Sequence, residues 1–357
     1  MKKRLTRVLA MALAIMMMAV FATGCQKTTT TSSNNSTKTV AETRTVVDFT
    51  GAEVKIPKVV NRICSTYPAV EEMFLLLGSP EKNIAVNTSN VNNEWYIKFY
   101  PQIAKLPMFL SATSEINVEM LMSLKPDVVI VSTKEQKSTV ENAGIPAVMM
   151  MGTSPETLIK CVNLLGEIMG EKETKIAVQL SAFYQNNIDK VTAKTTSIAK
   201  ADRPTVFYAA NGILNTEGNG SIVKSWIEMA GGVNIAAENG IEGTFKDVSP
   251  EQLLQWNPDI IICRDYAHKK AYLSDARLAK LSAIKNDKVY VNPRGVFPWC
   301  VRSADEALQV LWAATVIQPK LFADIDMKAE VTNFYKEYYK YTPTEKEIQD
   351  ILFPTAP

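Results

Sequence analysis

The amino-acid sequence predicts an α/β protein with two doubly wound lobes, a single long helix that joins them and a ligand cleft between them. Two observations carry this prediction. A short helix–strand unit occurs twice, and a stretch without proline or glycine lies between the two copies. Short apolar strands alternate with helices on both sides of that stretch, a pattern typical of mostly parallel sheets that are covered on both faces.

The repeated unit reads NVEMLMSLKPDVVIV from Asn117 to Val131 and SPEQLLQWNPDIIIC from Ser249 to Cys263. In each copy Asn or Ser caps a short helix with an acidic first turn, proline ends the helix, and a β-branched run follows as a buried strand. Two such units, about 130 residues apart, predict two similar lobes.

Residues 171–200 form the stretch between the two halves, and their apolar side chains recur at roughly helical spacing. A helix of this length spans about 45 Å, since each residue adds about 1.5 Å. We expect it to bridge the lobes, although it could belong to one lobe alone. The predicted boundaries are residues 45–170 for the N-terminal lobe, 171–200 for the linking helix and 201–357 for the C-terminal lobe.

The N-terminus indicates export. Basic residues precede an apolar run over residues 8–22, which is too short for a comfortable membrane span but suits a signal peptide. The following Ala-Thr-Gly-Cys ends at Cys25 and resembles the lipobox of bacterial lipoproteins. Residues 1–24 are therefore predicted to be a lipoprotein signal peptide and residues 25–44 a flexible polar tether. The expected location is the extracytoplasmic face of the cell membrane, with a lipid anchor at Cys25.

Charge and cysteine content exclude some classes of function. The whole chain has a formal charge of +2, and removal of the four basic signal residues leaves the mature chain near −2. No basic stripe suggests nucleic acid as a partner. Cys64, Cys161, Cys263 and Cys300 are widely spaced without a CxxC pair, and a disulfide among them is not expected.

The stretch from Thr45 to Gly78, TVVDFTGAEVKIPKVVNRICSTYPAVEEMFLLLG, resembles the start of helical-backbone metal-chelate receptors. The two Pro-Asp strand entries and SIVKSWIEMAGGVN from Ser221 to Asn234 match the same family in the same order. This resemblance covers nearly all of the mature chain. It implies a receptor for ferric siderophores, haem or vitamin B12 that delivers its ligand to an ABC permease and ATPase.

The resemblance also implies a docking surface. Receptors of this family tend to present one surface glutamate per lobe to the permease, and Glu72 occupies the first-lobe position. At the second-lobe position the chain has Ser225, which departs from the pattern. We expect the receptor to act as a monomer.

Residues that follow the predicted strands are candidates for the cleft, because ligands of open α/β sheets gather beyond the carboxyl ends of the strands. The set is aromatic and cationic, which suits an anionic ligand with an apolar surface. The predicted ligand-binding residues are Tyr67, Trp95, Tyr208, Arg264, Tyr266, Arg294, Trp299 and Arg302.

A site for a bare metal ion is not expected, because His268 is the chain's one histidine. His268 is a weak candidate ligand for a partly unsaturated metal complex. No cofactor is predicted, and a metal would arrive inside its own chelator, most simply as an iron(III)–siderophore complex.

Three other interpretations remain. A small oxyanion such as molybdate or tungstate could occupy the same fold. An anchored enzyme is disfavoured, because the chain has no GxSxG, HExxH, Walker-type or GxGxxG motif. A sensor or adhesin that binds a ligand without import would have the same architecture.

Overall fold

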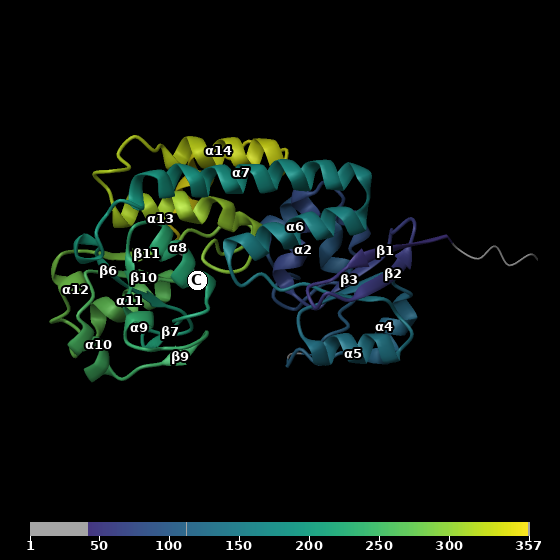
Figure 1. Ribbon diagram of the computed structural model, residues 1–357, viewed down its shortest axis with the longest axis horizontal. Helices are drawn as coiled ribbons and strands as arrows, with labels where there is room; N and C mark the ends of the chain where they lie inside the picture. The colour runs from purple at the N-terminus through teal and green to yellow at the C-terminus, as the bar shows by residue number, and fades with distance from the viewer. Residues whose placement is uncertain (1–41, 112, 356–357) are drawn as a thin grey trace, which may run out of the picture. The chain divides into compact units, whose positions relative to one another are not determined.

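The structure is a computed structural model that describes residues 42–111 and 113–355 (Figure 1). The predicted signal peptide and Cys25 lie outside the described residues. No helix within the described residues combines the length and the apolar character needed to cross a membrane.

The first element is strand β1 (Thr43–Val47), which pairs antiparallel with β2 (Glu53–Pro57). The tether was predicted to reach residue 44, but the Arg44 guanidinium donates hydrogen bonds to the carbonyls of Glu167 and Ile168 and fixes the chain there.

The first lobe contains a parallel sheet of three strands in the order β3-β4-β5. Alternate residues of β4 enter two different cores, Val128 and Ile130 the larger one and Val129 and Val131 a smaller one. Both sheet faces are therefore covered, as the unbroken β-branched run predicted. The elements are β3 (Ile63–Ser65), α2 (Pro68–Leu76), η1 (Pro80–Lys82), α3 (Glu94–Phe99), η2 (Pro101–Lys105), α4 (Val118–Leu124), β4 (Val128–Val131), α5 (Lys134–Asn142), β5 (Ala147–Met149) and α6 (Pro155–Met169).

The second lobe contains a parallel sheet of four strands in the order β11-β10-β6-β8 and a short antiparallel pair, β7 and β9. The residues of β6 also alternate between two cores. Val206 and Tyr208 enter the larger core, and Phe207 and Ala209 enter a separate one. The elements are η3 (Lys200–Asp202), β6 (Thr205–Ala209), β7 (Asn215–Thr216), α8 (Ile222–Met229), β8 (Val233–Asn234), α9 (Ile235–Glu238), β9 (Lys246–Asp247), α10 (Pro250–Trp256), β10 (Ile260–Cys263), α11 (Tyr266–Ser274), α12 (Ser282–Lys285), β11 (Val289–Val291), η4 (Ala304–Leu308) and α13 (Gln309–Ile317).

The sequence repeat is a structural repeat. The side chains of Asn117 and Ser249 cap α4 and α10 by accepting hydrogen bonds from backbone N–H groups of the first turn. Both helices end on a residue in the left-handed region, with φ of 48° at Lys125 and 43° at Asn257. The strands that follow, β4 and β10, each have another strand on both sides in their sheets. The predicted α/β architecture of two related lobes is confirmed.

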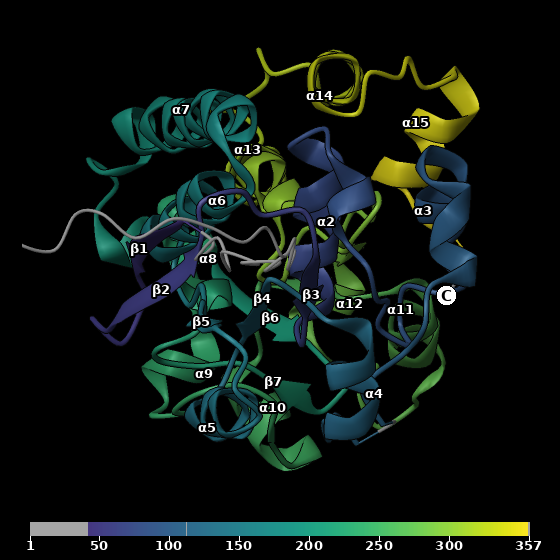
Figure 2. The same cartoon turned by 90° about the vertical axis from the view of Figure 1, so that its right-hand side faces the viewer.

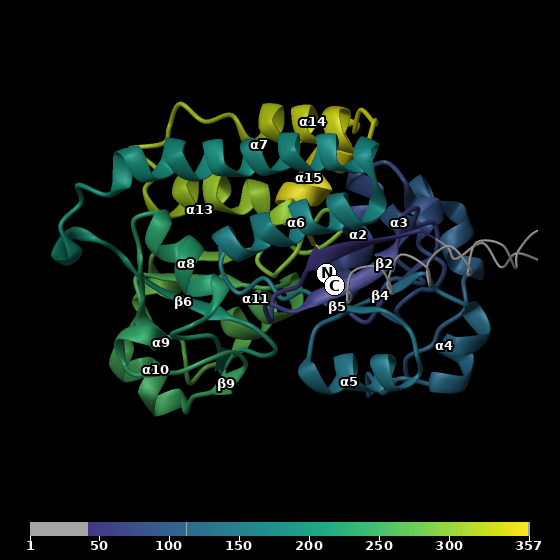
Figure 3. The same ribbon diagram turned by 45° about the vertical axis from the view of Figure 1, so that its right-hand side comes forward.

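One long helix, α7 (Glu171–Thr195), connects the two sheets along the chain (Figures 1 and 3). Leu180, Tyr184 and Ile188 of α7 enter the larger core, which also contains residues of both sheets. The helix ends five residues before the predicted end at 200, and the Arg203 guanidinium donates a hydrogen bond to the carbonyl of its last residue, Thr195, at 3.1 Å.

Two C-terminal helices add contacts that the sequence did not predict. Helix α14 (Met327–Tyr338) lies along α7, with ring centroids of Phe183 and Phe334 5.6 Å apart. Helix α15 (Glu345–Leu352) lies beside α3 of the first lobe (Figure 2), where Glu347 forms an ion pair with Lys98. The predicted boundaries placed residues 201–357 in the second lobe alone, yet this segment also contacts the first lobe.

Candidate ligand-binding site

A cavity of about 460 Å³ lies at the carboxyl ends of three neighbouring strands of the second lobe. Residues 210 and 211 follow β6, residues 264 and 265 follow β10, and Arg294 follows β11. We call this space the arginine cavity. Its position is the one at which parallel α/β sheets usually bind their ligands. Its lining residues are Ala210, Asn211, Arg264, Asp265, His268, Arg294 and Pro298.

Two arginines and one aspartate give the arginine cavity a positive balance. Arg264 donates a hydrogen bond from Nη1 to Asn211 Oδ1 at 2.6 Å, which orients the guanidinium. Asp265 caps α11 by accepting from the backbone N–H of His268 at 2.9 Å, and its Oδ2 lies 3.4 Å from His268 Nδ1. The Nδ1 edge of the imidazole therefore faces the Asp265 carboxylate, but the two atoms form no hydrogen bond.

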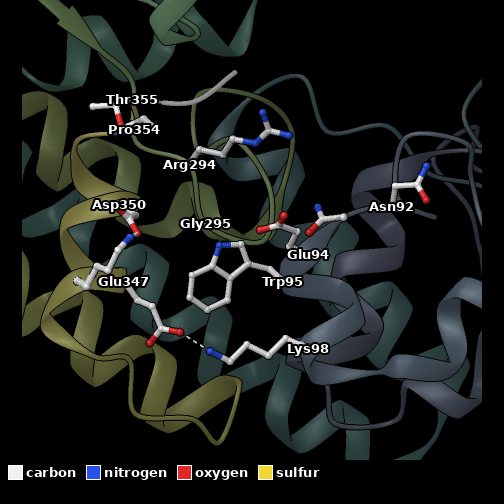
Figure 4. A pocket seen from close by; sticks show the side chains of 12 residues that line it. Asn92, Glu94, Trp95, Lys98, Arg294, Gly295, Glu347, Asp350, Pro354 and Thr355 are labelled. Atoms are coloured by element: carbon white, nitrogen blue, oxygen red, sulfur yellow. Dashed lines mark hydrogen bonds and ion pairs between the residues drawn. The ribbon is translucent and has the colours of Figure 1, made fainter.

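A second cavity, of about 680 Å³, lies between α3 of the first lobe and α15 of the second (Figure 4). We call it the tryptophan cavity, because the ring of Trp95 stands in its centre, between Arg294 and the ion pair of Lys98 with Glu347. Lys98 Nζ lies 5.1 Å from the centroid of the Trp95 ring. Arg294 is exposed and lines both cavities, so the two spaces meet at one guanidinium.

Tyr67 and Arg302 connect the lobes directly. Tyr67 precedes α2 in the first lobe, and its hydroxyl accepts a hydrogen bond from Arg302 Nε at 3.1 Å. Burial disfavours the charge of Arg302, but Tyr67, Glu217 and Glu306 raise its pKa above the ordinary value. The guanidinium therefore stays charged where the lobes meet.

Glu217 is a residue of this region that sequence reasoning missed. It follows β7 and is 1% exposed. Burial raises its pKa, while the charges of Arg302 and Arg264 act in the opposite direction. Glu217 is thus close enough to interact electrostatically with both arginines. A single glutamate after a two-residue strand carries no sequence signal for such a position.

Two predicted ligand residues are core residues instead. Tyr208 is 1% exposed, its ring packs edge-on against Trp226, and its hydroxyl donates to Cys300 Sγ at 3.1 Å. Tyr208 belongs to β6 itself, so it points into the sheet packing rather than past the strand end. Trp299 is fully buried and lies beside Gly295. Neither ring lines the arginine cavity or the tryptophan cavity, so the sequence-based placement of these two residues in the cleft is corrected to core packing.

Two further predictions need correction. Tyr266 is 38% exposed, but it lines a separate apolar hollow with Tyr290, Trp312 and Phe353, not the arginine cavity.

Glu72 was predicted as a surface docking residue, yet its side chain is fully buried. It accepts a hydrogen bond from the backbone N–H of Ala304 at 3.0 Å and so contacts the second lobe instead of a permease.

Within the described residues, no group of three or more histidine, cysteine, aspartate or glutamate side chains is placed to hold a metal ion. Cys64, Cys161, Cys263 and Cys300 are buried free thiols. Burial raises the pKa of the Cys64 and Cys161 thiols to about 12, so they pack as small apolar side chains.

Comparisons with known proteins agree with this architecture. The chain is 26% identical to the molybdate-binding protein MolA of Haemophilus influenzae, across 83% of this chain and 91% of that protein. It is 25% identical to an ABC transporter substrate-binding lipoprotein of Bacillus subtilis, across 78% and 87% of the two chains. A periplasmic solute-binding protein structure from Veillonella parvula superposes with a TM-score of 0.76 at 27% identity and covers 87% of this chain and 97% of that one.

The family model for periplasmic binding proteins matches residues 63–294, a range that runs from the first strand of the first parallel sheet, β3, to the arginine cavity. The match therefore includes both parallel sheets and the helix that joins them. This chain belongs to the periplasmic binding protein family.

Proposed function

We propose that the protein captures an anionic metal chelate, most simply an iron(III)–siderophore complex, and delivers it to an ABC import permease. The observation that carries this proposal is the meeting of two cavities at Arg294. Their volumes, about 460 and 680 Å³, are in the range of sites for drug-sized ligands. Arginines supply charge on one side, and Trp95 supplies apolar surface on the other.

The arginines are suited to oxygen-rich anions. A guanidinium presents planar pairs of N–H donors that match carboxylate, catecholate or oxyanion oxygens. A charge-assisted hydrogen bond that is shielded from water contributes about 1.5–3 kcal/mol. Loss of Arg294 or Arg302 should therefore weaken binding of an anionic chelate at least about tenfold.

This prediction can be measured by calorimetric titration of the full chain in detergent with three probes. These are an anionic iron(III) tricatecholate, a neutral iron(III) trihydroxamate and sodium molybdate. We expect the tricatecholate to bind, and Arg294→Ala and Arg302→Ala to weaken it. Arg277→Ala is the matched control, because this arginine of the same lobe is exposed and forms its ion pair with Asp275. Unchanged affinity in both the Arg294 and the Arg302 variant would contradict an anionic ligand.

The second candidate is a small oxyanion, and the similarity to a molybdate-binding protein over 91% of its length favours it. The two proposals differ at Trp95. An ion held by arginines alone would not need the indole ring, so Trp95→Ala should leave molybdate binding unchanged. A chelate that fills both cavities should lose affinity in the same variant.

The membrane anchor is also a proposal. A Cys25→Ser chain should fold normally but leave the membrane fraction, because each buried lipid methylene contributes about 0.8 kcal/mol to attachment. The B. subtilis relative named above, a lipoprotein, supports this proposal. Fractionation of cells that express the two chains provides the measurement, and a Cys25→Ser protein that still sediments with membranes would contradict it.

A further inference from the structure

Two buried carboxyl groups face each other where the lobes meet. Glu72 comes from α2 of the first lobe and Asp305 from η4 of the second, and neither is exposed. The hydroxyl of Tyr339 lies between them, 3.1 Å from Glu72 Oε1 and 2.8 Å from Asp305 Oδ1. The second oxygen of Glu72 accepts the backbone N–H of Ala304 at 3.0 Å. The three side chains form one hydrogen-bonded chain across the junction.

Counting the hydrogens shows that this chain needs an additional proton. The Tyr339 hydroxyl can donate to one carboxyl group only. Its contact with the other is a hydrogen bond only if that carboxyl group carries a proton and donates to the tyrosine oxygen. With both groups ionised, one short contact would join two acceptors in a buried site, which costs free energy.

Within the described part of the chain, no ion pair replaces the additional proton. Asp305 Oδ2 accepts a hydrogen bond from the backbone N–H of Phe297 at 3.4 Å. The phenols of Tyr96 on α3 and Tyr335 on α14 also lie near the pair, and the Trp299 indole lies near Asp305. The carboxyl groups of Glu71 on α2 and Glu347 on α15 act on these two phenols. The nearby cations are Lys98, which is paired with Glu347, and Arg294, which precedes Gly295 beside Asp305. Among the described residues, neither Glu72 nor Asp305 takes part in an ion pair.

The same elements carry the residues that join the lobes at the candidate site. Tyr67 immediately precedes α2, and Arg302 lies two residues before Ala304. The Glu72–Ala304 hydrogen bond therefore fixes the α2 end that carries Tyr67 against the segment that carries Arg302. Any opening at the carboxyl pair would also change the Tyr67–Arg302 contact.

We propose that Glu72 and Asp305 share one proton through Tyr339, and that this proton holds Tyr67 and Arg302 together at the lobe junction. Glu72 and Asp305 are in this sense positioning residues. The shared proton itself does not depend on which ligand binds. Its consequence for capture rests on the proposed function: the junction should hold its geometry at acidic and neutral pH and loosen as the pH rises.

The direction follows from the protonation equilibria. Burial, then the nearby Asp305 charge, raises the pKa of Glu72 well above 4.5, and burial raises the pKa of Asp305 to about 6. Acids whose pKa is raised in the folded state stabilise it at low pH, and this contribution is lost as the pH rises through the folded-state pKa. Loss of the shared proton leaves two buried negative charges on opposite lobes, which repel each other.

The test uses hydrogen exchange of the Ala304 amide in the ligand-free full chain, corrected for the intrinsic exchange rate, between pH 5 and 9. The wild-type protection factor should fall about tenfold or more across this range, since tenfold corresponds to one pKa unit. Glu72→Gln should remove this fall. The glutamine oxygen can accept from Ala304, and its NH₂ group can donate to Tyr339 without titrating.

Glu71→Gln is the matched control. Glu71 is the adjacent residue of α2, it is buried, and burial raises its pKa to about 8. Its oxygens accept hydrogen bonds from the Asn87 backbone at 2.7 Å and from the Asn90 side chain at 2.7 Å, both within the first lobe. This variant should keep the wild-type fall in Ala304 protection.

Asp305→Asn provides a second variant if Glu72→Gln does not fold, and it should also remove the fall. A flat wild-type profile would overturn the proposal, as would a wild-type slope in both the Glu72 and the Asp305 variants. None of these measurements uses a ligand. Failure of the tricatecholate to bind would therefore contradict the proposed function and leave the shared proton standing.

Discussion

At the scale of single residues, Gly295 in the loop after β11 occupies a position where the neighbouring side chains leave no room for a larger residue. A methyl group at this position would collide with the Tyr335 hydroxyl and lie 2.7 Å from Asp305 Oδ2. Both neighbours are fully buried and have little room to move. Glycine therefore allows the backbone that carries Arg294 to pass close to the buried Asp305 carboxyl group.

We expect Gly295→Ala to reduce the free energy of unfolding by about 1–3 kcal/mol, as overpacking of a filled core usually does. Urea denaturation measures this change. Adding Tyr335→Phe should recover part of the loss, because it removes the hydroxyl with which the new methyl group collides. A single variant within about 0.5 kcal/mol of wild type would show that the neighbours can move aside.

Sequence reasoning located the arginines better than the aromatic residues. Arg264 and Arg294 follow strands, and strand ends of one parallel sheet meet at one edge, so both reach the arginine cavity. Tyr208 was counted as following a strand but lies within one. Glu72 could not be placed from the sequence, because its partners Ala304 and Tyr339 are 232 and 267 residues away.

At the scale of elements, the repeat was predictable because its signals are local. Caps, the proline and the β-branched run all lie within 15 residues. The sequence did not show what the Pro-Asp step shared by the two copies does. Asp127 Oδ2 accepts the backbone N–H groups of Asn61 and Arg62 at 2.8 and 2.9 Å, just before β3. Asp259 Oδ2 accepts from the backbone and hydroxyl of Thr205, at the start of β6, both at 2.8 Å.

Each aspartate therefore fixes the register between its own strand and the neighbouring one. We expect Asp127→Ala and Asp259→Ala to lower the free energy of unfolding by about 1–2 kcal/mol each, the loss of two partly exposed hydrogen bonds. The matched controls are Glu119→Ala and Glu251→Ala, the other acidic pair of the repeat, which is exposed in the first helical turn. These should cost at most about 0.5 kcal/mol, and equal losses in both pairs would contradict the register role.

For the C-terminal helices, the sequence shows where a helix begins but not which element it packs against. Thr344 and Glu347 form a capping box that starts α15, a signal that lies in the sequence itself. The partner of α15 is α3, about 250 residues earlier, and only the folded chain brings Lys98 to Glu347. The lobes are thus joined by α7, by the C-terminal helices and by the Glu72–Tyr339–Asp305 chain.

At the scale of the whole molecule, buried carboxyl groups should set the pH dependence of stability. Burial raises the pKa of five of them, Glu71 to about 8, Asp305 to about 6, and also Glu72, Glu217 and Glu306. The folded state then binds more protons than the unfolded state above about pH 4.5, so stability falls as the pH rises. The opposite effect comes from carboxyl groups whose pKa is lowered, among them Asp48 and Asp324. The largest such change is at Glu347, whose pKa is lowered to about 2 although burial opposes this, because Lys98 and the Thr344 backbone bind the carboxylate.

Stability should therefore pass through a maximum at about pH 4–6 and decline toward pH 9, whereas many proteins are most stable nearer neutrality. Each extra proton bound by the folded state contributes a slope of about 1.4 kcal/mol per pH unit. Calorimetric melting of the ligand-free chain from pH 3 to 9 at constant ionic strength measures the profile. Glu72→Gln should make the decline of stability at alkaline pH less steep, because one titrating carboxyl group is removed. Lys98→Ala should change the profile at acidic pH instead, because it removes the cation that lowers the pKa of Glu347. A melting temperature that rises from pH 5 to 8 would mean that these carboxyl groups are ionised in the folded protein, and the shared proton at the lobe junction would then have no basis.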